Sequence, residues 1–182
     1  MVDKKFLIFL AKFLLLFGVL YGGTLAVIGL AAPGGLYSPF IEQYLDYVSW
    51  IKQSLVWGAH HTVAAAGYET YQAPGYVLRH VGGRGVMIAM DCVGYGVYSF
   101  WIAYVIANDG SWKRKLLWSV GGVLALWAIN VGRISLFLIS LIKNKPMPFG
   151  IDHHTWFNIV AYLFIFGMIW AFERSVRRGV GS

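Results

Sequence analysis

Four long runs of apolar residues constrain the fold of this chain more than any other feature. They cover residues 13–32, 92–107, 116–142 and 156–172. A helix that crosses the hydrocarbon core of a bilayer needs about 20 apolar residues, so the second run is short for a crossing. Only 13% of the 182 residues are charged, against about a quarter in a typical soluble domain. We therefore predict an all-α integral membrane protein with about four transmembrane helices and a single domain over residues 1–182.

The basic residues indicate how the spans are oriented. They flank the apolar runs in three groups, which are Lys4, Lys5 and Lys12, then residues 113–115, then Arg174, Arg177 and Arg178. Lys and Arg concentrate in the cytoplasmic loops of membrane proteins. With an internal N-terminus and four crossings, all three groups lie inside. This placement favours a multi-pass protein of the cell membrane over a nucleic-acid-binding protein, in spite of the net charge of +7.

The loop over residues 33–91 is then external, and its sequence predicts two kinds of structure. Apolar residues recur at helical spacing over residues 41–66, which predicts an amphipathic helix at the membrane interface. The stretch "GYVLRHVGGRGVMIAM" (residues 75–90) predicts two short strands joined by Gly82 and Gly83 as a β-hairpin. Its second strand leads directly into Asp91 and Cys92.

Cys92 is the one cysteine of the chain, so the chain has no internal disulfide. We expect it in the first turn of the second span, at the external end. The positive end of the helix dipole favours the thiolate form of a cysteine in that position. Gly94 leaves room for a substrate to approach closely.

Two further segments place reactive side chains at the same membrane level. Arg133 lies inside the third apolar run, where an arginine costs at least ~2.5 kcal/mol and marks a candidate functional site. Asn130, one turn earlier, is placed to hold the guanidinium or to polarise the same pocket. "DHHTWFN", residues 152–158, precedes the fourth span and supplies a histidine that can exchange protons near neutral pH. Thiol, guanidinium and imidazole together provide a nucleophile, a charge stabiliser and a proton shuttle for acyl transfer.

The chain resembles the exosortase/archaeosortase family in "DCVGYG" (91–96), "NVGRI" (130–134) and "HTWFN" (154–158). The resemblance covers the chain from about residue 75 onward. It implies a membrane-embedded cysteine protease or transpeptidase that cleaves C-terminal sorting signals of exported, membrane-tethered proteins, often with transfer of the new end to a membrane or surface anchor. By the same resemblance, Cys92, Arg133 and His154 match the catalytic residues. Asn158 stands four positions after His154, and this spacing selects His154 over His153 as the catalytic histidine. His153 is then expected to support His154. No cofactor is implied.

Two other classes of function stay open at this point. Cysteine, histidine and aspartate side chains at the external level could form a metal site of a transporter or metal sensor, although Arg133 would repel the cation. The candidate ligands are Cys92, His60, His61, Asp152, His153 and His154. Alternatively, the chain is a non-catalytic assembly partner that uses its aromatic spans.

Overall fold

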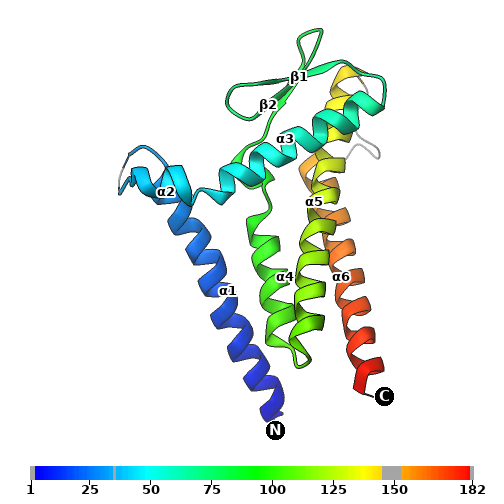
Figure 1. Ribbon diagram of the computed structural model, residues 1–182. Helices are drawn as coiled ribbons and strands as arrows, with labels where there is room; N and C mark the ends of the chain where they lie inside the picture. The colour runs from blue at the N-terminus through cyan, green and yellow to red at the C-terminus, as the bar shows by residue number, and fades with distance from the viewer. Residues whose placement is uncertain (1–2, 35, 145–152, 181–182) are drawn as a thin grey trace. The chain divides into compact units, whose positions relative to one another are not determined.

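The structure is a computed structural model that describes residues 3–34, 36–144 and 153–180 (Figure 1). Six α-helices, one 3₁₀ helix and a small sheet make up this part of the chain. The elements in chain order are α1 (Lys4–Ala31), α2 (Pro39–Tyr44), α3 (Tyr47–Ala65), β1 (Thr70–Ala73), β2 (Val77–His80), β3 (Gly85–Met87), η1 (Met90–Cys92), α4 (Tyr95–Ala107), α5 (Trp112–Ile142) and α6 (His153–Val180). The predicted predominance of helix is confirmed.

Three helices of the described residues are long and apolar enough to cross a membrane, where the sequence predicted about four. They are Lys4–Ala31 with 28 residues, Trp112–Ile142 with 31, and Asn158–Arg177 within α6 with 20. The predicted second span is the apolar helix α4, which has 13 residues. At 1.5 Å per residue this is about 20 Å, less than the ~30 Å hydrocarbon core.

Local backbone chemistry explains why α4 is short. Gly94 has φ +78 just before its first residue, and Gly110 has φ +138 shortly after its last. A side chain strongly disfavours such φ values, whereas glycine adopts them without strain. At the C-terminal end, the amide of Asn108 donates to the Tyr104 carbonyl and satisfies one of the last helical acceptors.

The predicted hairpin is confirmed, and the structure adds a third strand. β2 pairs antiparallel with β3, with Leu78 opposite Val86. β1 pairs antiparallel with the other edge of β2 and places Gln72 opposite Leu78. The strand order is therefore β1-β2-β3. β1 has only four residues, too few for its alternation to stand out from the flanking sequence.

The amphipathic helix predicted over residues 41–66 is interrupted. α2 ends at Tyr44 and α3 begins at Tyr47. The Leu45 N–H donates to the Ile41 carbonyl, and its φ of −123 with ψ of 1 is not helical. Asp46 comes directly before α3, and aspartate is among the residues preferred at that capping position.

The described chain divides into two compact units. One contains Met1–Val48, Tyr95–Ala125 and Ile165–Ser182, and the other contains Ser49–Gly94 and Leu126–Phe164. In the first unit α1 runs beside α4, and aromatic rings of α1 contact aromatic rings of α4 (Figure 1). The contacting pairs are Phe9 with Tyr104, Phe13 with Phe100 and Tyr21 with Tyr95.

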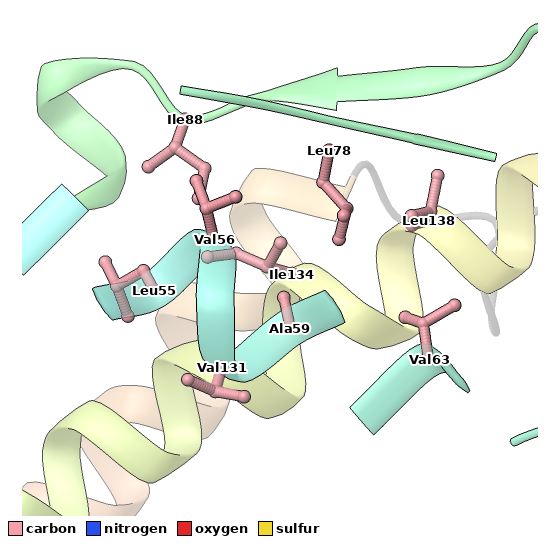
Figure 2. Close-up of a cluster of buried hydrophobic side chains, with 9 residues drawn as sticks. All are labelled: Leu55, Val56, Ala59, Val63, Leu78, Ile88, Val131, Ile134 and Leu138. Carbon is pink, nitrogen blue, oxygen red and sulfur yellow. The ribbon is translucent and has the colours of Figure 1, made fainter. Parts of the chain in front are cut away.

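The second unit has a hydrophobic core made by α3, β2 and the C-terminal half of α5. Figure 2 shows its side chains pointing toward one another, and they are Leu55, Val56, Ala59, Val63, Leu78, Ile88, Val131, Ile134 and Leu138. Arg84, between β2 and β3, donates to the Leu141 carbonyl at 2.6 Å and to Asn144 Oδ1 at 2.9 Å. The guanidinium thereby satisfies a carbonyl in the last turn of α5, where positive charge is favoured by the helix dipole.

Candidate functional site

Cys92 lies at the end of η1, three residues before α4 begins. This corrects its predicted position in the first turn of a helical span. Gly94 is the physical reason, since its φ of +78 turns the chain between the 3₁₀ turn and α4. The Cys92 N–H donates to the Ala89 carbonyl at 3.0 Å. Cys92 therefore does not occupy the helix N-terminal position that was predicted for it.

The thiol itself belongs to a partly exposed side chain. Cys92 is free and packs against the rim of the hydrophobic core of the second unit. Val93, its neighbour, is fully buried at 0% exposure. The buried Val93 anchors this part of the chain, while Cys92 keeps part of its surface accessible.

Asn130 connects α5 to the Cys92 segment. Its side-chain Nδ2 donates to the Cys92 carbonyl at 2.7 Å and to the Val93 carbonyl at 3.2 Å. Carbonyl oxygens only accept hydrogen bonds, so the amide group must present its NH₂ to them. Asn130 was expected to hold the Arg133 guanidinium or to polarise the same pocket, and in the structure its NH₂ contacts the backbone of the cysteine motif. The segments "DCVG" and "NVGR" are therefore joined by hydrogen bonds within one compact unit.

The oxygen of the same amide has a different environment. Asn130 Oδ1 is buried and has no hydrogen-bond partner among the described residues. A buried acceptor without a donor costs about 1–3 kcal/mol. A donor that reaches this oxygen would therefore be bound favourably. Asn130 Oδ1 belongs to the same side chain whose Nδ2 donates to the Cys92 carbonyl.

Arg133 lies on α5 one turn after Asn130 and is partly buried. Residues three positions apart lie on the same face of a helix. The neighbouring Val131 and Ile134 point into the hydrophobic core. Arg133 therefore belongs to the same unit as Cys92 and to the helix face from which Asn130 contacts the Cys92 backbone.

The histidine motif begins α6. This helix starts at His153, three residues before the predicted start of the fourth span, so its first turn contains His154. The side chains of His153 and His154 lie outside the described part of the structure. Asn158 is exposed. The N-terminal half of α6, up to Phe164, belongs to the same compact unit as Cys92, Asn130 and Arg133.

The candidate metal ligands are partly accounted for by other contacts. His60 Nδ1 is 2.8 Å from the Thr70 hydroxyl, and His61 Nδ1 is 2.8 Å from the Trp57 carbonyl. Within the residues that the structure describes, no three His, Cys, Asp or Glu side chains are grouped closely enough to hold a metal ion. Asp152 and the two histidine side chains that follow it lie outside those residues.

One unusual residue of the second unit was not predicted from the sequence. Lys52 on α3 is only 8% exposed, and its ammonium lies 4.1 Å from the centre of the Tyr76 ring. An aromatic face stabilises a cation that has lost part of its water. The sequence signal is weak, because Lys52 lies in an amphipathic helix where a lysine is ordinarily exposed. Comparisons of the chain with protein-family models, with curated proteins and with solved structures gave no match.

Proposed function

We propose that this chain is a membrane-embedded cysteine protease or transpeptidase that cleaves C-terminal sorting signals of exported proteins. The observation that carries the proposal is the pair of hydrogen bonds from Asn130 to the Cys92 and Val93 carbonyls. They bring together two of the three motifs on which the resemblance to exosortases and archaeosortases depends. The third motif begins α6, half of which belongs to the same compact unit.

The proposed reaction is an acyl transfer through Cys92. His154 accepts the thiol proton, and the sulfur attacks the carbonyl carbon of the scissile peptide bond. The carbonyl oxygen becomes an oxyanion. Arg133 either stabilises this oxyanion or positions the substrate carbonyl for the attack. When the C–N bond breaks, His154 gives its proton to the leaving amine. Water or an amine nucleophile then releases the thioester on Cys92, as hydrolysis or as transfer to an anchor.

The proposed location is the cell membrane, with the N-terminus inside and the site facing outside. Three long apolar helices are compatible with a membrane protein. The substrate is a second membrane protein, tethered by a C-terminal span that follows a short recognition signal. A site next to the bilayer suits such a substrate, because both proteins are confined to the same surface.

The test is co-expression with a membrane protein of this kind that is encoded nearby or that co-purifies. The chain should shorten the substrate, and Cys92→Ala should abolish the shortening. Arg133→Lys should nearly abolish it, since lysine keeps the charge but loses the planar two-point contact. His154→Ala should reduce the rate by about 10²–10⁴-fold, the usual contribution of a general acid–base group. His153→Ala is the matched control and should reduce the rate far less.

Each variant must first elute from size exclusion in detergent as the wild type does. With that established, shortening at the wild-type rate in Cys92→Ala would exclude a cysteine enzyme. An acyl-enzyme trapped with a labelled substrate and released by hydroxylamine would identify the thioester directly.

A further inference from the structure

An apolar groove in the first unit lies apart from the cysteine site. It has a volume of about 370 Å³ and runs between α4 and the N-terminal part of α5. Its walls are aliphatic, with Ile102 and Ile106 from α4 and Leu116, Val120, Val123 and Leu124 from α5. A cavity of this size is within the range that holds small ligands. In a membrane, an aliphatic groove of this kind is suited to an acyl chain.

One basic side chain, Lys115, lies at an end of the groove. Lys115 lines the groove together with Trp112. The Lys115 ammonium donates to the Ile106 carbonyl at 2.8 Å and lies 5.4 Å from the centre of the Trp112 ring. An ammonium has three N–H donors, and the Ile106 carbonyl takes one of them. These two contacts hold the ammonium of Lys115 at this end of the groove.

The start of α5 adds to this positive potential. The helix begins at Trp112 and has no acidic residue in its first turn, so the positive end of its dipole is not neutralised there. Lys113 is exposed and follows Trp112 by about 100° around the helix axis, at the edge of the groove-lining face. The preceding turn contains one acidic residue, Asp109, whereas residues 113–115 are three consecutive basic residues, so the local net charge is positive. Aliphatic walls with a cationic end match the chemistry of an anionic phospholipid.

We propose that the groove binds one anionic phospholipid, with an acyl chain along α4 and α5 and the phosphate at Lys115 and Lys113. Trp112 is 72% exposed beside this end, and tryptophan concentrates at the headgroup level of membranes. The bound lipid tethers the turn between α4 and α5 to the headgroup region. This inference rests on the proposed membrane location and is independent of the proposed cysteine chemistry.

The test uses the full chain in vesicles of phosphatidylglycerol and phosphatidylcholine in equal amounts, with the same acyl chains. After extraction in mild detergent, native mass spectrometry counts the lipids that stay bound. The wild type should retain one phosphatidylglycerol in preference to phosphatidylcholine. Lys113→Gln should reduce this preference about five-fold, because one lysine near a membrane surface contributes about that much to anionic-lipid binding. Arg114→Gln is the matched control: it removes the same charge from a position about 200° from Trp112, away from the groove, and should leave the preference unchanged.

A second pair of variants tests the groove itself. Val120→Trp should fill the groove and abolish retention of the lipid, whereas Leu117→Trp should preserve it. Both side chains are exposed, at 51% and 72%, but only Val120 lines the groove. Retention of the two lipids in the vesicle ratio by the wild type would overturn the proposal. So would an equal effect of Lys113→Gln and Arg114→Gln, which indicates bulk charge alone, or normal retention by Val120→Trp.

Discussion

At the scale of single residues, Asn130 is the contact that a substitution can test most directly. Asn130→Ala removes the donor for the Cys92 and Val93 carbonyls and leaves two acceptors without it. We expect a net loss of about 1 kcal/mol in the free energy of unfolding, because the cost of about 1–3 kcal/mol for a buried group that loses its partner is partly offset by removal of the unpartnered Asn130 Oδ1. Cys92 should also react faster with a maleimide, because the segment before α4 is released from α5. As Cys92 is the one cysteine, the labelling rate reports on that segment alone.

Ser135→Ala provides the control for this prediction. The Ser135 hydroxyl is on the same helix, and it donates to the Val131 carbonyl within α5 itself. Its removal should change the stability of α5 slightly and leave the labelling rate of Cys92 unchanged. Equal acceleration in both variants would mean that general loosening of the unit, rather than the Asn130 contact, controls access to the thiol.

At the scale of elements, the packing of α4 against α5 depends on a glycine. Trp101 is fully buried and its Nε1 donates to the Trp118 carbonyl at 2.9 Å. A Cβ at Gly122 would lie 1.8 Å from that same Nε1. Gly122→Ala should therefore push the indole away and cost about 1–3 kcal/mol in overpacking, in addition to the hydrogen bond. Thermal unfolding in detergent, followed by near-ultraviolet circular dichroism of the tryptophans, measures the loss.

Gly121→Ala is the adjacent control for the same helix. A Cβ at Gly121 would meet nothing within 4 Å. Alanine is favoured over glycine in a helix by about 1 kcal/mol, so this variant should be as stable as the wild type or more so. If the two alanine variants unfolded at the same temperature, close approach of Trp101 to α5 would not be what fixes this packing.

At the scale of the whole molecule, the question is whether the short helix α4, with 13 residues, crosses the membrane. With four crossings, Cys92 lies outside and the turn between α4 and α5 lies inside. A membrane-impermeant thiol reagent added to intact cells should therefore label the wild type at Cys92. It should not label Asp109→Cys in a Cys92→Ser background until the cells are opened. Labelling of both positions from outside would show that α4 does not cross, and labelling of Cys92 only after opening would reverse the proposed orientation.

The helical class, the long apolar helices near both ends and in the middle, and the hairpin joined at Gly82 and Gly83 could all be predicted from the sequence. These features depend on local hydrophobicity and on turn-forming residues, and both can be recognised in a short stretch of consecutive residues. The candidate residues Cys92 and Arg133 were also found this way, since a single thiol and an arginine within a long apolar run stand out from their background.

The positions of these residues relative to neighbouring elements could not be predicted from the sequence. In the structure Cys92 lies before α4, because the positive φ of Gly94 separates the preceding turn from that helix. The tertiary structure also gave Asn130 a partner 38 positions away along the chain and placed Lys52 beneath the Tyr76 ring. Each of these depends on which surfaces of α3, α5 and the sheet meet around the core. Contacts between distant segments depend on the packing of whole elements, and no short window of sequence specifies that packing.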